Sequence, residues 1–148
     1  MTAEQALLLP VGDDLYALSV DWILEVVAAP KVTRLTTAPP TVLGLFNLRG
    51  HIVPMFDTAA LLGVGTVRAT TFAVVVNCPQ GPAGLAVTDL PERGVLGEGT
   101  GSSRLSGTVG LYEVGDRVVS LLDPAVLLSP ERIGGRGFGV DATHIEVG

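Results

Sequence analysis

Short apolar segments separated by glycine and proline follow one another along most of the chain. The 19 glycines and 10 prolines interrupt it roughly every eight to twelve residues, and the segments between them are rich in Val, Leu and Ile; this spacing is typical of an all-β sandwich or barrel. The strands that the pattern predicts cover residues 6–11, 15–19, 31–35, 45–48, 51–56, 71–76, 83–88, 93–96, 109–114 and 117–122.

Two short helices are predicted at residues 58–62 and 124–128. Each follows an aspartate, Asp57 or Asp123, and aspartate is a favourable residue at a helix N-cap. The second helix begins with Pro124, which the first turn of a helix tolerates. We therefore expect both aspartates to cap the helices that follow them.

An internal repeat contains both of these helices. Residues 44–62 align without a gap to residues 110–128, with seven identities in nineteen positions. In each copy a two-residue turn containing glycine, Arg49-Gly50 or Gly115-Asp116, joins two strands before the aspartate and the helix. Such self-similarity indicates repeated architecture. We expect two similar halves, with a chance likeness between two hairpins as the alternative.

The repeat makes two predictions about packing. Val53 and Val119 occupy the same position in the two copies, so both should be buried in equivalent hairpins. Two barrels side by side should also leave a groove with exposed apolar side chains, where a partner helix could bind.

Composition limits the classes of partner. Hydrophobic residues make up 47% of the chain and charged residues 16%, against about 25% charged in typical soluble domains. The apolar surplus fits either an exposed contact patch or a tightly packed core. The net charge is −6 and Lys31 is the only lysine, which disfavours binding to nucleic acid or to an anionic membrane surface.

Several absences indicate a cytoplasmic protein. No apolar run approaches the length of a membrane span. Residues 1–5 lack the basic start and apolar stretch of a secretory signal. Cys78 is the only cysteine, so no disulfide can form within the chain.

Candidate catalytic residues are sparse. His51 and His144 lie far apart in the sequence, and Cys78 has no basic neighbour to activate its thiol. The glycine-rich stretch at residues 97–103 lacks the Gly-Lys-Ser/Thr ending of a phosphate-binding loop. No spacing of cysteines and histidines suits zinc. We predict a protein that is not an enzyme and has no cofactor or metal, and leave open a composite site assembled by folding.

The stretch at residues 40–57 resembles the most specific signature of the CheW family of chemotaxis adaptors. It contains Gly44, then Asn47-Leu48-Arg49-Gly50, then Ile52, Pro54 and Asp57. Weaker likeness extends over about residues 6–130, with departures at Thr58-Ala59, where the family often has Leu-Arg, and at Thr88, where it tends to have Asp.

The resemblance implies two SH3-like five-stranded β-barrels in tandem around a groove, with short helical turns. It implies a single CheW-like domain at residues 6–131, with approximate halves at 6–69 and 70–131 and exchange of strands between them left open. Residues 132–148 would form a glycine-rich flexible tail.

The implied function is a cytoplasmic, non-enzymatic scaffold recruited to membrane-associated receptor arrays. It would couple the cytoplasmic hairpin tip of chemoreceptors (methyl-accepting chemotaxis proteins) to the regulatory domain of a CheA-type histidine kinase. The alternatives are a paralogue in a pilus or surface-motility pathway, a detached fragment or paralogue of the kinase's own regulatory domain or of a CheW–receiver fusion, and an unrelated β-barrel enzyme or small-ligand binder.

The resemblance also implies the residues that bind these partners. They are Ile23, Glu25, Val32, Arg34, Gly44, Asn47, Arg49 and Gly50. It places residues 23–26 on a helical turn, where Ile23 and Glu25 would point in nearly opposite directions. We therefore expect Glu25 to be exposed.

Overall fold

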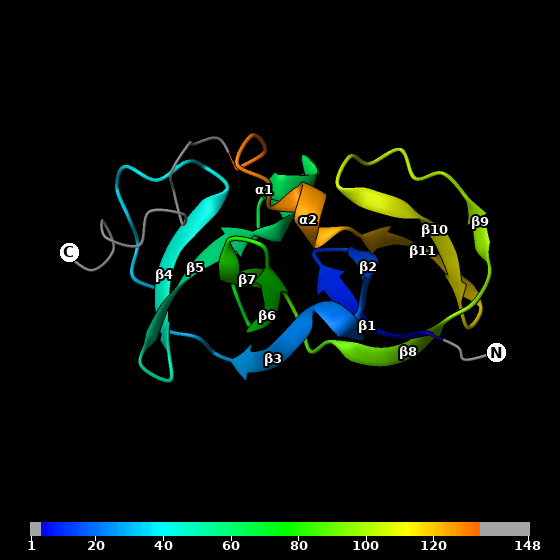
Figure 1. Ribbon diagram of the computed structural model, residues 1–148, viewed down its shortest axis with the longest axis horizontal. Coiled ribbons are helices and arrows are strands. Elements are labelled where there is room, and N and C mark those ends of the chain that lie inside the picture. Colours follow the sequence, from blue (N-terminus) through cyan, green and yellow to red (C-terminus); the bar gives the residue numbers. More distant parts are fainter. Residues whose placement is uncertain (1–3, 134–148) are drawn as a thin grey trace.

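Strands dominate residues 4–133, the part of the chain that the computed structural model describes. They form a six-stranded sheet of order β8-β1-β2-β11-β10-β9 and a five-stranded sheet of order β3-β6-β7-β5-β4, side by side (Figure 1). The strands are β1 (Glu4–Val11), β2 (Asp14–Ser19), β3 (Ile23–Ala28), β4 (Val42–Leu48), β5 (His51–Asp57), β6 (Phe72–Cys78), β7 (Gly81–Val87), β8 (Glu92–Leu96), β9 (Gly99–Gly101), β10 (Thr108–Val114) and β11 (Arg117–Leu122). The prediction of an all-β fold is confirmed.

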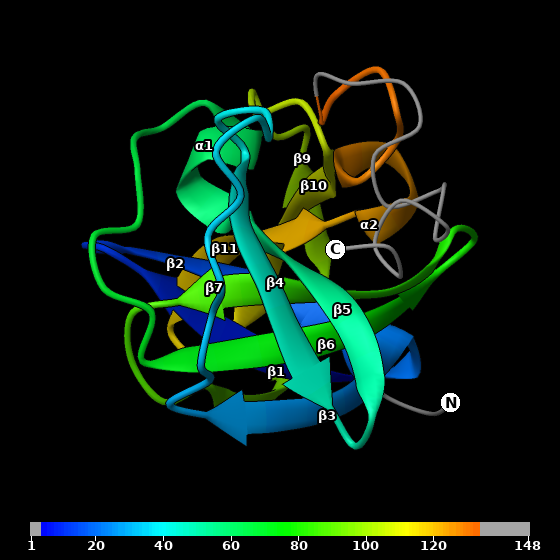
Figure 2. The ribbon, with the colours of Figure 1, turned by 90° about the vertical axis from the view of Figure 1, so that its left-hand side faces the viewer.

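Each sheet curls without closing into a barrel by strand pairing within residues 4–133. In the six-stranded sheet the amide of Gly97, just after β8, donates to the Glu113 carbonyl of β10 at 2.6 Å. In the five-stranded sheet an isolated bridge joins Thr33, between β3 and β4, to Leu45 of β4. Figure 2 shows the β4–β5 hairpin crossing in front of β6 and β7.

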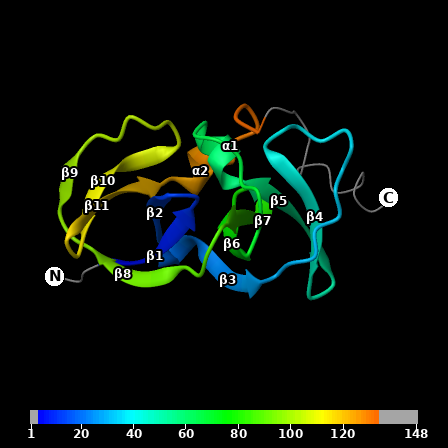
Figure 3. The ribbon, with the colours of Figure 1, turned by 180° about the vertical axis from the view of Figure 1, so that it is seen from behind.

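The chain builds the six-stranded sheet from two separate segments, β1–β2 and β8–β11. β1 and β2 pair with strands from the other end of the sequence, β8 and β11, while β3 to β7 build the five-stranded sheet between them. Figure 3 shows β1 and β2 beside β10 and β11 from behind. The two sheets are therefore tied together by the path of the chain.

The hairpins of the repeat are equivalent in pairing. Leu45 pairs with Pro54 in β4–β5, and Leu111 pairs with Ser120 in β10–β11, each 66 positions later. The register shifts between Val42 and Gly44 in the first hairpin and between Thr108 and Gly110 in the second. The prediction of equivalent hairpins is confirmed.

Burial supports the same equivalence. Val53 is 1% exposed and Val119 is 4% exposed, as predicted. The second strand of each hairpin also pairs in parallel with another strand of its own sheet, β5 with β7 and β11 with β2. The repeat is therefore a duplication of architecture within the described residues.

The two short helices differ in how they begin. α1 (Thr58–Leu62) has Asp57 as N-cap, whose Oδ1 accepts from the Ala60 amide at 3.0 Å. α2 (Pro124–Leu127) has no side-chain cap, so the prediction for Asp123 is wrong. The backbone carbonyl of Asp123 instead accepts hydrogen bonds from the amides of Val126 and Leu127 at 3.1 and 2.8 Å.

Two predicted elements in the first half are also wrong. Residues 23–28 form strand β3, preceded by the 3-10 helix η1 (Val20–Trp22), rather than a helical turn. The neighbouring residues Val26 and Val27 are β-branched, which favours an extended backbone. Residues 31–35 form only the isolated bridge from Thr33 to Leu45 instead of a full strand.

The main core lies between the two sheets. It includes Leu9 and Leu18 of the six-stranded sheet, Val74 and Leu85 of the five-stranded sheet, and Leu127 of α2, all fully buried. A smaller cluster of buried residues belongs to the six-stranded sheet: Ala6, Leu8, Ala17, Leu96, Val114, Val119 and Leu121. Of the predicted tail at residues 132–148, only the first two residues lie within the described part of the chain.

Candidate partner-binding site

The turn between β4 and β5 has a backbone that few sequences adopt. Arg49 has φ +54° and Gly50 has φ +88°, and two successive positive values are typical of the type I′ hairpin turn. Non-glycine residues rarely occupy this region. The Asn47 Oδ1 accepts from the Gly50 amide at 2.8 Å and so stabilises the turn.

The turn presents Arg49 to Glu25 on β3. The Arg49 Nε lies 3.4 Å from the Glu25 Oε1, and Nη2 donates to Oε2 at 3.5 Å. The Arg49 side chain is 78% exposed and that of Glu25 is 29% exposed. β3 and β4 are the two ends of the strand order, so this ion pair bridges the opening of the curled sheet and leaves most of the guanidinium accessible.

The position of Glu25 differs from the prediction. Along β3, Ile23, Glu25 and Val27 are half-buried, whereas Leu24 and Val26 are exposed. The register shifts between Ile23 and Glu25, which pair with the adjacent residues Val76 and Val75 of β6, so the usual alternation does not place Ile23 and Glu25 on one face of the sheet. Glu25 is therefore a partly covered acceptor for Arg49 rather than a solvated side chain.

Gly44 explains how Val32 and Arg34 reach this region. It is buried with φ +152°, and a Cβ atom there would lie 2.1 Å from the Thr33 carbonyl oxygen. That approach allows Thr33 and Leu45 to exchange two hydrogen bonds, at 2.7 and 2.8 Å. The half-buried Val32 and the exposed Arg34 are thereby held against β4.

The eight predicted residues thus fall into two groups along the two edge strands of the five-stranded sheet, β3 and β4. One is the turn with its ion pair, formed by Asn47, Arg49, Gly50 and Glu25, with Ile23 further along β3. The other is the Thr33 bridge, formed by Val32, Arg34 and Gly44. We call the whole set the hairpin surface.

Sequence reasoning missed the apolar part of this surface. Ile52 is 47% exposed and pairs with Asn47 across the hairpin, and Leu24 of β3 is 52% exposed. Ile52 already stood in the family signature. Ile52 directly precedes Val53, which was predicted to face inward. Because successive residues of a strand face opposite sides, the same pattern places Ile52 on the outer face.

A groove between the sheets was predicted without residues. It is lined by Glu4, Ser19, Asp21, Trp22, Asn77, Val109, Leu121 and Leu122. Asn77 belongs to β6 of the five-stranded sheet and Val109 to β10 of the six-stranded sheet. Val109 is 55% exposed, whereas Leu121 and Leu122 are buried, so among the apolar residues that line this groove only Val109 has the predicted exposure.

Both departures from the family pattern have structural partners. The hydroxyl of the buried Thr58 donates to the Ala86 carbonyl at 2.7 Å, and Ala59 beside it is 5% exposed. Thr88 Oγ1 accepts from the Gly12 amide at 3.0 Å and donates to the Pro10 carbonyl at 3.1 Å. Thr88 thereby links the end of β7 to the β1–β2 turn of the other sheet.

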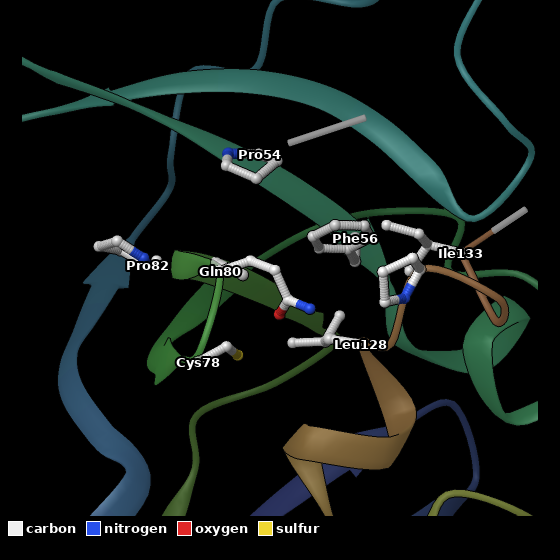
Figure 4. A pocket seen from close by; sticks show the side chains of 10 residues that line it. Pro54, Phe56, Cys78, Gln80, Pro82, Leu128 and Ile133 are labelled. Carbon is white, nitrogen blue, oxygen red and sulfur yellow. The ribbon is translucent and has the colours of Figure 1, made fainter. Parts of the chain in front are cut away.

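The Cys78 thiol is free and buried. Burial raises the pKa of Cys78 to about 11, so at neutral pH it is protonated and unreactive. It borders an apolar pocket beside Phe56, Leu128 and Ile133 (Figure 4). Within residues 4–133 no three His, Cys, Asp or Glu side chains gather as metal ligands, and no helix is both long and apolar enough to cross a membrane.

A family model, that of the CheW-like domain, matches residues 5–132. The chain belongs to the CheW-like domain family. The match covers both sheets, α1, α2 and the hairpin surface. The resemblance first seen in the Asn-Leu-Arg-Gly turn therefore extends over nearly all of the described residues.

Individual relatives agree with the family. The chain is 26% identical over 142 residues to the chemotaxis protein CheW of Klebsiella aerogenes, covering 88% of this chain and 84% of that protein. It is 39% identical over 54 residues to the chemotaxis protein CheW of Helicobacter pylori, covering 36% of this chain and 33% of that protein. The match to the Rhizobium meliloti chemotaxis protein CheW is 32% over 66 residues, 45% of this chain and 43% of that protein.

A solved structure shows the same fold. The crystal structure of the scaffolding protein TtCheW from Thermoanaerobacter tengcongensis superposes with a TM-score of 0.73 at 21% identity. The superposition covers 85% of this chain and 92% of that one. The arrangement of two curled sheets is thus shared by a distant member of the family.

Proposed function

We propose that residues 6–131 act as one CheW-like domain that couples chemoreceptors to a CheA-type histidine kinase in chemotaxis. The family match over residues 5–132 carries this proposal. The protein works as a scaffold: it catalyses no reaction, needs no cofactor, and acts in the cytoplasm at receptor arrays.

The groove between the sheets suits a receptor helix. Its apolar side chains include the exposed Val109 and the half-buried Trp22, and Glu4 and Asp21 add acidic groups. A helix that lays an apolar face into a groove is a common mode of recognition. We assign the groove to the cytoplasmic hairpin tip of a chemoreceptor.

The hairpin surface suits a β-structured partner. It combines the accessible guanidinium of Arg49 with the exposed apolar side chains of Ile52 and Leu24. Arginine ringed by apolar side chains is a common anchor in protein interfaces. We assign this surface to the regulatory domain of the kinase, with Ile23, Glu25, Val32, Arg34, Gly44, Asn47 and Gly50 shaping or contacting it.

A pull-down tests the function and selects the pathway. The purified chain is immobilised and offered each CheA-type kinase of the same organism, with and without a receptor cytoplasmic fragment. The proposal expects one kinase to be retained and the receptor fragment to be retained with it. Retention of none of the kinases would contradict the proposal, and the identity of the retained kinase separates chemotaxis from a pilus or surface-motility pathway.

A further inference from the structure

The segment that follows α2 leaves the six-stranded sheet and packs on the five-stranded sheet. Leu128 and Ile133 are buried against Phe56 of β5 (Figure 4). The Thr41 hydroxyl, just before β4, donates to the Ile133 carbonyl at 3.0 Å. Residues 128–133 therefore lie across the junction of the two sheets, and we call them the clasp.

Arg132 of the clasp holds one element from each side of that junction. Its Nη1 donates to the Ser106 Oγ at 2.6 Å, and its Nη2 donates to the carbonyls of Leu61 and Ser106. The Leu61 carbonyl lies in the last turn of α1, where helix carbonyls lack intrahelical partners and favour a cation. Ser106 lies in the loop that leads into β10.

The loop held by Arg132 ends at the groove. Ser106 is followed by Gly107, whose carbonyl accepts from the Asp123 amide at 2.9 Å. Gly107 has φ +89°, and a Cβ atom there would lie 2.6 Å from the Leu127 side chain. The loop is thus pressed onto α2 two residues before Val109.

Val109 lies at a β-bulge at the start of β10. It is the extra residue where the register shifts between Thr108 and Gly110, and a residue at such a β-bulge is aimed differently from its neighbours. Leu43 is the equivalent residue at the register shift of the first hairpin, and it is half-buried, whereas Val109 is exposed. The direction of Val109 therefore depends on how the start of β10 is held.

We infer that Arg132 is a positioning residue for the groove: by fixing Ser106 against α1, it aims the bulged Val109 at the partner helix. This inference rests on the proposed function of the groove for its consequence in binding. The positioning itself is a property of the free protein.

A partner-free measurement tests the positioning. Methyl groups of Val109 are followed by NMR in the wild type, in Arg132→Gln and in Ser106→Ala, with Arg104→Gln as a matched control in the same loop. Arg104 is exposed and makes no hydrogen bond among the described residues. We expect Arg132→Gln and Ser106→Ala to shift or split the Val109 resonances and the control to leave them unchanged.

Two results would overturn the inference. One is an unchanged Val109 in a folded Arg132→Gln protein; if that variant fails to fold, Ser106→Ala, which loses one hydrogen bond only, decides in the same way. The other is an equal shift in Arg104→Gln. Neither result depends on any partner.

A binding cycle tests the consequence. Affinity for a receptor hairpin-tip fragment is measured for wild type, Arg132→Gln, Val109→Ala and the double variant. We expect each single variant to lose about tenfold and the double variant to lose little more, because both act through Val109. Additive losses would contradict the positioning role, whereas a wild type that binds no receptor fragment would contradict the proposed function of the groove and leave the NMR result standing.

Discussion

Gly44 and Gly110 occupy the same place in the two copies of the repeat, yet they should respond very differently to the same substitution. In Gly44→Ala the new Cβ would lie 2.1 Å from the Thr33 carbonyl oxygen and 2.8 Å from its carbon. Both atoms are backbone, so residues 32–34 must move off β4. In Gly110→Ala the nearest atom, the Gly101 carbonyl oxygen, is 3.0 Å away, and a shift of a few tenths of an ångström removes the clash.

The cost of Gly44→Ala follows from what must break. Thr33 and Leu45 exchange two hydrogen bonds, worth about 1 kcal/mol each. The positive φ of +152° adds strain of about 1–3 kcal/mol for a residue with a side chain. Lower entropy of the unfolded chain returns about 0.4–1 kcal/mol. We expect Gly44→Ala to lower the free energy of unfolding by about 2–4 kcal/mol and Gly110→Ala by less than about 1.5 kcal/mol.

Urea denaturation of both variants measures this difference, and amide hydrogen exchange at Thr33 and Leu45 locates it. We expect faster exchange at these two amides in Gly44→Ala and unchanged exchange there in Gly110→Ala. Equal destabilisation by the two substitutions would refute the account of Gly44 as a site of close backbone approach.

Three further predictions concern single side chains. Arg49→Ala should change the free energy of unfolding by less than about 1 kcal/mol, since an exposed ion pair stabilises little, and should weaken partner binding by about 1–3 kcal/mol; calorimetry measures both, and unchanged binding would count against the hairpin surface. Asp57 accepts hydrogen bonds from the amides of Ala60 and Val67, so Asp57→Ala should cost about 2–4 kcal/mol, whereas Asp123→Ala should cost less than about 0.5 kcal/mol in the same urea titration; similar costs would mean that the caps are equivalent after all. The pKa of Cys78 is raised from 9.0 to about 11, so its contribution to stability is complete below pH 9 and is lost as the pH rises through 11; replacement by Ala should remove that part of the alkaline decline seen in thermal melts, and an identical decline would disprove it.

Local patterns predicted the elements that a short segment determines by itself. The turn at Arg49-Gly50, the helix at residues 58–62 and the inward valine of each hairpin all follow from neighbouring residues and the period of a strand. The repeat then related the two hairpins because duplicated sequences keep their register.

Elements that depend on a distant part of the chain could not be predicted from the local sequence. β3 is a strand because β6 pairs with it, and the same six residues could form a helical turn in isolation. Residues 31–35 look extended, but their pairing is limited to Thr33, where Gly44 admits a close approach. Asp123 resembles Asp57 in sequence, yet its side chain caps nothing.

The candidate site also contains residues that are adjacent in sequence and residues that only folding brings together. The residues of the Asn-Leu-Arg-Gly turn are adjacent in sequence, so a family signature could mark them. The groove brings together Glu4, Trp22, Asn77 and Val109, which no local motif connects. Placing β1 and β2 in the sheet of β10 and β11 brings residues from the two ends of the sequence together, and Asn77 joins them from β6 of the other sheet.

The central claim is that one small scaffold joins two partners through two separate surfaces. Isothermal calorimetry with a receptor hairpin-tip fragment and with the kinase regulatory domain, each titrated into wild type, Arg49→Ala and Val109→Ala, tests it most directly. We predict that Arg49→Ala weakens binding of the kinase domain alone, that Val109→Ala weakens binding of the receptor fragment alone, and that the wild type binds both at once. Competition between the two partners for the wild type, or equal effects of both substitutions on both partners, would contradict it.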